Sequence, residues 1–307
     1  MDIEQKKAAM RAIIKRGKRW DMLFASIGLL CLAFGLLTVL ILVGRMGVEG
    51  LERLSLDFFL NYPSRRAANA GILSAWVGSL LVMFVTALAA VPLGVGAGIY
   101  LEEYAKKNWW VTDVIEINIS NLAAVPSIVY GLLALGIFVY QFGLGGSILS
   151  AGLTLALLIL PIVIVATREA IRAIPGAMRE GSMAVGATKW QTVRYHILPY
   201  SMPGILTGVI IGLARAIGET APIITIGALT FIAFLPPVPF VEGAGMFDWA
   251  MSPFTVMPIQ MFNWTSRPEE AFQANAGAAG FVLVVMTLGM NALAIWLRYR
   301  LRKNIKW

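Results

Sequence analysis

The sequence is short of charged residues. Asp, Glu, Lys and Arg make up 14% of its 307 residues, against roughly 25% in soluble globular domains. Hydrophobic residues instead make up 58% of the chain, and its mean hydropathy is +0.76. A composition this apolar is typical of a membrane protein, so we expect a chain that crosses a bilayer and has no sizeable soluble domain.

Metal-binding and nucleophilic side chains are also scarce. The chain contains one cysteine, Cys31, and one histidine, His196. A lone thiol cannot form an intrachain disulfide, and these two residues cannot supply the ligand set of a zinc site. The chain therefore has almost none of the side chains that Ser-His-Asp hydrolysis or metal catalysis would require. We predict no catalytic residue and no metal site, and we expect Cys31 to be an ordinary small residue in a helix.

Six apolar stretches are long enough to cross a bilayer, which takes about 20 residues as a helix. They lie at residues 21–43, 72–99, 117–139, 147–166, 201–223 and 277–297. The first is longer than the core of a cleavable signal peptide, which is about 7–15 residues, so we interpret it as a retained span. The chain is predicted to be an all-α polytopic membrane protein with a transmembrane domain over 21–297.

Lysine and arginine are unevenly distributed among the connecting segments. They concentrate in residues 1–20, 101–113, 168–199 and 298–307, and they are sparse in the alternate segments 45–70, 141–146 and 236–276. Cytoplasmic loops carry the Lys/Arg excess in membrane proteins. The pattern predicts that both termini are cytoplasmic, with a basic N-terminal arm and a basic C-terminal tail. We expect the arm to form an interfacial helix on lipid headgroups. The net charge of +8 is then a topology signal, and we expect no nucleic-acid partner.

Two of the predicted spans contain a proline that we expect to disturb the helix. Pro92 and the glycines after it should loosen the end of the second span, and Pro126 should kink or break the third. Irregular backbone at membrane depth is tolerated only where protein or a water-filled cavity covers it. We therefore expect the break at Pro126 to face the bundle interior, with an ordinary proline kink as the alternative.

The external segment 236–276 is rich in proline, and we expect it to contain short helices near the outer surface. Its aromatic residues favour a belt at the membrane–water interface. These residues are Phe247, Trp249, Phe254, Phe262 and Trp264.

The polar loop at 168–199 predicts two helices outside the bilayer. Residues 177–185 are rich in helix formers, and Gly186 is the residue expected where a helix ends and the chain reverses. A second helical stretch, 187–197, should end before Pro199 at the entrance of the fifth span. The plain alternative is a solvated amphipathic loop with no partner.

The same loop contains the spacing of a phosphate-binding P-loop at Gly181 and Gly186. That motif requires lysine where Ala187 stands, and it requires a strand before its first glycine. We therefore expect no ATP site in this chain.

The loop resembles a signature of ABC importer permeases, E-A-A-x3-G-x9-I-x-L-P. The matching positions are Glu180, Gly186, Leu198 and Pro199. The sequence departs from the signature at Gly181, Ser182 and His196. The resemblance implies that the loop is a coupling helix, which sits in a groove of a cytoplasmic ATPase subunit and passes its motion to the spans. It implies that Thr188, Lys189 and Trp190 lie near this contact.

Further stretches resemble the phosphate branch of that family. They are VPSIVYG, LPIVIVATREAI, REGSMAVGATKWQTVRYHILP, ARAIGETAPI and PFTVMPIQMFNWTSRP. The resemblance implies a type I ABC importer permease in the bacterial plasma (inner) membrane that translocates inorganic phosphate. It implies four partners: a second homologous permease, a cytoplasmic ATPase dimer, an extracytoplasmic phosphate-binding protein and membrane lipid. ATP and magnesium then belong to the ATPase, and this chain is expected to be no enzyme and to hold no cofactor.

A charged pair lies inside the fifth apolar stretch. Arg215 follows Pro199 by sixteen residues, or roughly 24 Å along a helix, which is inside a bilayer core of about 30 Å. A charge at that depth is costly, so we expect Arg215 to face the bundle interior. Glu219 follows four residues later, on the same helical face.

Two interpretations of this pair remain open. The pair could be an ion pair that only fixes helix packing. Alternatively, Arg215 faces the translocation path, where its planar fork of donors suits phosphate or another oxyanion. Glu219 would orient it and moderate its charge, so that the anion can leave, and Thr220 would add a hydroxyl donor. The likeness to the phosphate branch favours the second interpretation.

Three other functions are alternatives to phosphate import. The chain could be a permease for sulfate, molybdate or phosphonate, which the shared loop signature does not exclude. It could be a secondary transporter or channel that works without ATP, although it has six spans, no inverted repeat and a coupling-type loop. An intramembrane enzyme could use Arg215 and Glu219 as acid and base, but no nucleophile accompanies them.

Overall fold

The computed structural model describes residues 3–106, 109–239, 241, 243 and 245–302, and most of them are helical. The strand-type pairing found among them is an isolated bridge between Ser147 and Pro253. Five helices are long and apolar enough to cross a membrane, and a sixth span results if two sharply bent helices count as one. The predicted all-α, six-span architecture is confirmed.

The long helices are α1 (Ile3–Gly50), α3 (Leu73–Ile99), α6 (Ile148–Arg172), α9 (Leu198–Ile217) and α12 (Glu270–Arg302). The bent pair is α4 (Trp110–Leu122) and α5 (Ser127–Ala134). The shorter helices are α2 (Leu56–Leu60), α7 (Gly176–Ala184), α8 (Lys189–Thr192), α10 (Ala221–Thr225) and α11 (Met257–Thr265). Within the described chain, the π-helical turns are η3 (Tyr100–Tyr104), η4 (Leu135–Gln141) and η5 (Val193–Ile197), and the 3₁₀ turns are η1 (Leu51–Arg53) and η2 (Ala67–Asn69).

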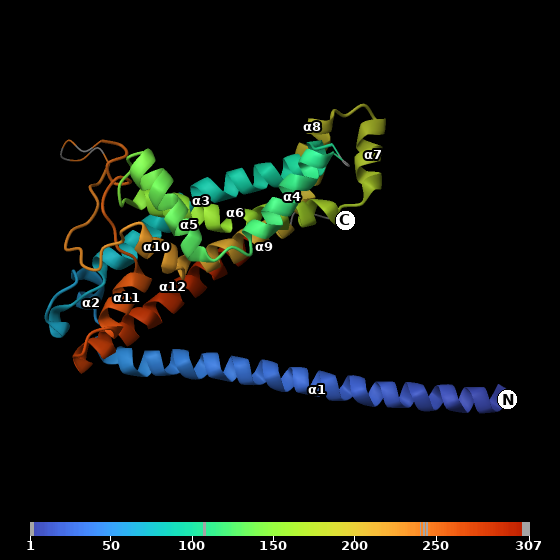
Figure 1. Cartoon of the computed structure of the whole chain (residues 1–307), viewed down its shortest axis with the longest axis horizontal. Helices are drawn as coiled ribbons and strands as arrows, with labels where there is room; N and C mark the ends of the chain where they lie inside the picture. Colours follow the sequence, from blue (N-terminus) through green and yellow to red (C-terminus); the bar gives the residue numbers. More distant parts are fainter. Residues whose placement is uncertain (1–2, 107–108, 240, 242, 244, 303–307) are drawn as a thin grey trace.

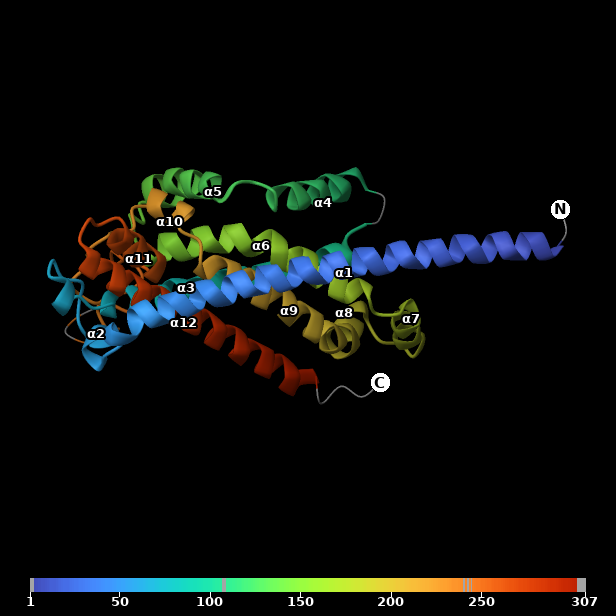
Figure 2. The ribbon, with the colours of Figure 1, turned by 90° about the horizontal axis from the view of Figure 1, so that it is seen from below.

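The helices α3, α6 and α9 run side by side through the centre of the bundle, and α12 packs along α9 (Figures 1 and 2). One end of the bundle carries α7 and α8, and we call it the loop end. The opposite end carries α2, α10 and α11, and we call it the far end. The first helix begins and the last helix ends on the side of the loop end, which is the arrangement that an even number of spans requires.

The first helix is uninterrupted from Ile3 to Gly50. The prediction of a separate interfacial helix at residues 1–20 is therefore wrong for the described part of that arm, because no breaker separates it from the span. Near the far end, α1 touches α12, where a Cβ on Gly50 would lie 2.5 Å from the Cα of Ala278. Residues 1–2 of the arm, and 303–307 of the predicted basic tail 298–307, lie outside the described residues.

The contact between α3 and α6 depends on glycine. The helix α3 continues through Pro92, so the prediction that Pro92 and the glycines loosen it is wrong. A Cβ on Gly98 would lie 2.6 Å from the Cβ of Thr167, and a Cβ on Gly94 would lie 2.7 Å from Cγ1 of Val163. These glycines stand one turn apart on the face that meets α6. As small residues do between membrane helices, they let the two backbones approach closely.

On its other side, α6 meets α9 through a second set of small residues. A Cβ on Gly208 would lie 2.1 Å from the Cβ of Ala166, and a Cβ on Gly204 would lie 2.6 Å from the Cβ of Ala170. The most apolar window of α6 is 67% buried, the largest share among the candidate spans. The sixth helix is therefore the centre of the bundle.

The third predicted span is broken, as expected at Pro126. The helix α4 ends at Leu122, α5 begins after Pro126, and their axes differ by 108°. The Tyr130 hydroxyl donates to the Leu122 carbonyl at 2.7 Å, so it satisfies one acceptor that the break leaves free. Residues 121–124 are exposed. The expectation that the interior of the bundle covers this break is therefore wrong for the chain by itself.

The fifth span differs from its predicted limits at both ends. One continuous helical segment runs from Lys189 to Ile217, so Pro199 lies inside it and the predicted stop before Pro199 is wrong. In a regular α-helix the proline ring would clash with the carbonyl of Tyr195, whereas the wide π turn η5 directly precedes it here. At the other end, α9 stops at Ile217, and Glu219 lies beyond the helix.

The segment 236–276 contains a short helix, α11, as expected, but its aromatic residues do not form one belt. Trp264 and Phe254 are 1% and 2% exposed and belong to the core, whereas Phe247 and Phe262 are exposed. The segment folds inward because the Met257 amide donates to Ser79 Oγ of α3 at 2.8 Å. The expected interfacial belt is therefore wrong for the two buried rings.

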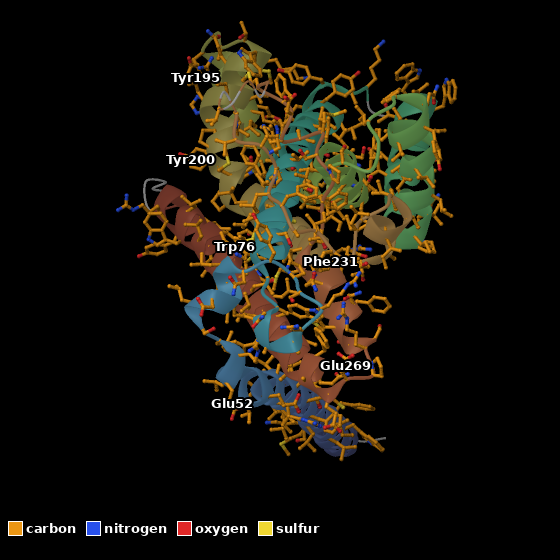
Figure 3. The ribbon with its side chains drawn as sticks, turned by 90° about the vertical axis from the view of Figure 1, so that its left-hand side faces the viewer. Glu52, Trp76, Tyr195, Tyr200, Phe231 and Glu269 are labelled. Atoms are coloured by element: carbon orange, nitrogen blue, oxygen red, sulfur yellow. The ribbon has the colours of Figure 1, made fainter. Side chains whose placement is uncertain are left out.

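Figure 3 shows the molecule from the far end, with Trp76 and Phe231 above Glu52 and Glu269. Trp76 is held there because its Nε1 donates to the Phe59 carbonyl at 3.1 Å.

We expect Gly98→Ala to lower the free energy of unfolding by about 1–3 kcal/mol, the usual cost of overpacking a close-packed interior. Gly96→Ala is the matched control, since Gly96 lies on the same helix and a Cβ there has nothing within 4 Å. The midpoint of thermal unfolding in detergent measures both effects. Equal midpoints for the two variants would contradict the close contact of α3 with α6.

Candidate functional site

Arg215 and Glu219 form an ion pair at the end of α9. Arg215 Nε lies 3.4 Å from Glu219 Oε1. The sequence predicted this contact on a continuous helix, but the helix ends between the two residues. The pair persists because the Gly218 and Glu219 amides bond to the Arg215 and Ala216 carbonyls, at 3.3 and 3.2 Å. These tight turns keep Glu219 beside the guanidinium.

The ion pair is not enclosed by this chain. The Arg215 side chain is 40% exposed and that of Glu219 is 19% exposed. The expectation that Arg215 faces the interior of the bundle is therefore wrong for the isolated chain, since its guanidinium lies on an open face. Thr220 is half-buried beside the pair and begins α10 without a capping bond from its own hydroxyl. A charge at this position needs a polar or protein environment, because facing lipid is costly.

Two motifs that are distant in the sequence meet next to this pair. Gly131 of VPSIVYG lies so close to α10 that a Cβ would be 2.6 Å from the Pro222 Cα. Figure 2 shows α10 against α5 at the far end. Tyr130 precedes Gly131 and belongs to the same buried apolar cluster as Ala216 and Ile217, which follow Arg215 in α9. The broken span and the ion pair therefore form one region of the molecule.

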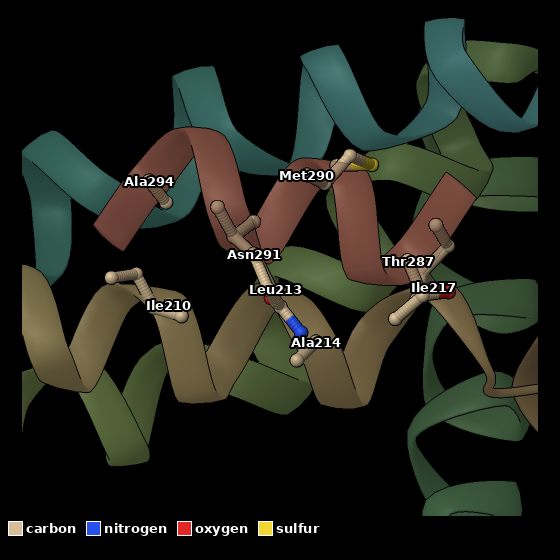
Figure 4. A pocket seen from close by; sticks show the side chains of 8 residues that line it. All are labelled: Ile210, Leu213, Ala214, Ile217, Thr287, Met290, Asn291 and Ala294. Atoms are coloured by element: carbon tan, nitrogen blue, oxygen red, sulfur yellow. The ribbon is translucent and has the colours of Figure 1, made fainter. Parts of the chain in front are cut away.

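The cavity between α9 and α12 is too small for an oxyanion. Its volume is about 30 Å³, which is roughly the share of one water in the liquid. Figure 4 shows its lining, in which Asn291 of α12 points toward α9 beside Leu213 and Ala214. This cavity is therefore not a binding site for an oxyanion, and Arg215 does not line it.

The loop 168–199 folds as two helices joined by a tight turn, as predicted. Gly186 has φ +91°, a conformation that residues with a side chain rarely adopt. Thr188 caps α8 in a reciprocal capping box with Gln191. The hydroxyls of Ser182 and Thr192 lie 3.0 Å apart and hold the two helices together.

The residues predicted near an ATPase contact, Thr188, Lys189 and Trp190, are all exposed. Glu180 and Trp190 are exposed, and Val185, 86% exposed, lies at the tip of the loop. Although Lys189 is exposed, its Nζ lies 5.2 Å from the centre of the Tyr104 ring. The loop thus exposes apolar side chains together with acidic and basic ones.

Six charged residues at the loop end escaped the sequence analysis, and we call them the charged cluster. They are Glu102, Glu103, Glu116, Arg168, Arg172 and Arg179. Their arginines entered the sequence argument only as a topology signal. The adjacent acids of LEEY and the one-turn spacing of Arg168 and Arg172 were the available clues. Among the described residues, no group of three or more His, Cys, Asp or Glu side chains could hold a metal ion.

Comparison with known proteins agrees with this geometry. Residues 90–307 match the family described as binding-protein-dependent transport system inner membrane component. The chain is 34% identical over 263 residues to the "Probable ABC transporter permease protein YqgI" of Bacillus subtilis (strain 168), covering 84% of this chain and 88% of that protein. It is 31% identical over 284 residues to the phosphate transport system permease protein PstA of Xylella fastidiosa (strain Temecula1 / ATCC 700964). This match covers 90% of this chain and 93% of that protein.

Among solved structures, that of a bacterial alginate ABC transporter, in complex with a periplasmic protein that binds an alginate pentasaccharide, shares the fold. Its TM-score is 0.62 at 15% identity, and the match covers 90% of this chain and 93% of that one. The helices therefore have the arrangement of a type I ABC importer permease. The chain belongs to the family of binding-protein-dependent transport system inner membrane components, and it is a permease subunit of an ABC importer.

Proposed function

We propose that this permease imports inorganic phosphate into a bacterial cell across the plasma membrane. The observation that carries the proposal is the guanidinium of Arg215, which lies on an open face near the far end of α9. Relatives named as phosphate transport permeases support phosphate as the substrate. A permease for another oxyanion is the alternative that the same chemistry allows.

The contacts of Arg215 suit reversible binding of an oxyanion. Glu219 engages Nε at 3.4 Å, which leaves the two Nη groups for a ligand. Arginine binds phosphate through two parallel charge-assisted hydrogen bonds. The nearby carboxylate orients the guanidinium and reduces its field, so the ion is bound and then released. Thr220 contributes a further donor on the same side.

The open face of Arg215 implies a second permease subunit. Residues 121–124 and the Arg215 side chain are both exposed, although free backbone and charge are costly in lipid. A homologous, PstC-like permease covers this face, and the path for the ion runs between the two chains. A PstS-like phosphate-binding protein then delivers the ion at the far end, which is extracytoplasmic. The loop end and both termini are cytoplasmic.

The exposed loop is the contact with a PstB-like ATPase dimer. Val185 and Trp190 are exposed apolar side chains of this loop, and Glu180 is an exposed acidic side chain on α7. Apolar side chains at the end of a short, rigid helix suit insertion into a groove of a partner. The ATPase holds ATP and magnesium and performs the hydrolysis, whereas this chain holds no cofactor of its own.

We expect Arg215→Gln to reduce phosphate uptake about 10- to 100-fold, since a hydrogen bond to a charged group contributes about 1.5–3 kcal/mol. Uptake of radiolabelled phosphate is measured in cells that lack other high-affinity phosphate import. Arg45→Gln is the matched control, because Arg45 and Glu49 form an exposed ion pair of the same spacing on α1. Excess unlabelled sulfate is added as competitor.

Full uptake by Arg215→Gln would contradict the role of this arginine in the path. Failure of that variant to assemble with its partners would instead support an ion pair that only fixes helix packing. Uptake by the unmodified chain that sulfate abolishes would favour another oxyanion.

We expect Gly186→Pro to uncouple ATP hydrolysis from uptake. Proline fixes φ near about −65°, whereas Gly186 has φ +91° and its amide donates to the Met183 carbonyl at 3.0 Å. The substitution therefore distorts the tip of the loop. Gly181→Ala on α7 is the control, since a Cβ there has nothing within 4 Å. Normal uptake per ATP hydrolysed in Gly186→Pro would count against the loop as the ATPase contact.

A further inference from the structure

The π-helical turn η3, with the sequence YLEEY, is contacted by three other elements of the loop end. It continues α3 directly, and the two count as one span from Leu73 to Tyr104. Its first contact is with α6. Glu102 Oε2 lies 3.0 Å from Arg172 Nη2 and 3.6 Å from Arg168 Nε, and the Glu102 side chain is nine-tenths buried. Arg168 also pairs with Glu116 of α4.

The second contact of η3 is with α7, the first helix of the exposed loop. Arg179 places Nε and Nη2 at 2.9 and 2.8 Å from Glu103 Oε1. The same guanidinium donates to the Ile174 and Ile171 carbonyls, at 2.8 and 2.9 Å. The carbonyls at the C-terminal end of a helix have no partner within the helix. One side chain of α7 therefore binds both the end of α6 and the end of the second span.

The third contact is with α8, the other helix of the loop. Lys189 lies over the ring of Tyr104, the last residue of η3. Beneath these polar contacts, Ile99 of α3 packs against a small apolar core that contains Ile171 and Ile197. Both helices of the loop therefore hold η3 by side chains, and α7 also packs against this apolar core through Met178.

The π conformation explains how two adjacent glutamates serve two different partners. Glu102 and Glu103 are 10% and 8% exposed, although they are neighbours in the sequence. A π turn has more residues per turn than an α-helix, so successive side chains are separated by a smaller rotation. Both carboxylates can then face protein, one toward α6 and the other toward α7. A regular α-helical turn would rotate one of them further toward solvent.

Stability alone does not account for these pairs. Taking charges out of water costs about as much as their attraction returns, so a buried ion pair is weak evidence for stabilisation. What such a pair does supply is a fixed geometry. Arg179, with two bonds to a carboxylate and two to carbonyls, cannot move without moving the groups that it binds.

We propose that η3 receives the motion of the exposed loop and passes it to the membrane-spanning helices. Arg179 and Lys189 are positioning residues, which carry a displacement of α7 and α8 to Glu103 and Tyr104. Glu102 then passes it to α6 through Arg168 and Arg172. The proposal rests on the proposed function of the loop as the ATPase contact. It adds that the second span, and not only the two spans joined by the loop, is driven directly.

The test uses the complete complex in lipid vesicles, with ATP hydrolysis and phosphate uptake measured in the same sample. We expect Arg179→Gln and Glu103→Gln each to raise the ATP hydrolysed per phosphate imported about tenfold, within the usual range of a coupling free energy between two sites. The double variant should be no worse than either single variant, because each already breaks the pair. Arg194→Gln is the control, since Arg194 is exposed on η5 and its described contact is the Tyr195 ring.

Several outcomes would overturn the proposal. The first is an unchanged ratio of ATP hydrolysed to phosphate imported in Arg179→Gln, and the second is additive effects on that ratio in the double variant. The third is loss of the assembled complex in all three variants, because the Arg179–Glu103 pair would then only support the fold. Arg179→Lys keeps the charge but not the fork, and it should give an intermediate ratio. If the unmodified complex imports sulfate instead of phosphate, the substrate proposal fails, and the ratio is measured with sulfate. If that complex hydrolyses ATP without importing any substrate, the proposed coupling of ATP hydrolysis to import is wrong.

Discussion

The close backbone contacts of α6 with α3 and α9 are the constraint on which the rest of the molecule depends. Glycines one turn apart on α3 and α9 bring both helices against α6, and a bilayer offers no hydrophobic drive that could replace such contacts. Because α6 is fixed on both sides, its loop end presents Arg168 and Arg172 to η3. At the opposite end of α9, the same contacts fix where Arg215 lies. The charged cluster and the Arg215–Glu219 pair are thus both attached to helices that pack closely around α6.

The chain encloses its own apolar core but leaves the region around Arg215 uncovered. Its apolar core closes around α6, yet Arg215 and the break before Pro126 remain uncovered. Burying a guanidinium is costly without a partner or water, so a charged face of this kind requires a polar or protein environment in the assembled protein. This arrangement agrees with a permease that works as one of two membrane subunits.

Local rules predicted the features that depend on local chemistry. Pro126 breaks its helix because it lacks an amide donor, and Gly186 reverses the chain because its φ is positive. Features that depend on distant partners were missed. Trp264 is buried because its segment bonds to α3, and the role of Glu103 requires knowing that Arg179 lies beside it. The prediction that a helix ends before Pro199 and a new span begins there was wrong. A π turn has no clear sequence signature, and here the π turn η5 accommodates the proline ring within one continuous helix.

The most direct test of this account is the distance between two spin labels, one on Val185 at the loop tip and one on Tyr100 in η3, measured in the assembled complex. Both side chains are exposed, so labels there leave the charged cluster intact. A second pair of spin labels, one on Tyr100 and one on the partner permease, reports whether the complex changes conformation when ATP binds. The account predicts that the second distance changes, while the Val185–Tyr100 distance stays the same, because the loop and η3 move as one body. A change in the Val185–Tyr100 distance on ATP binding would contradict it.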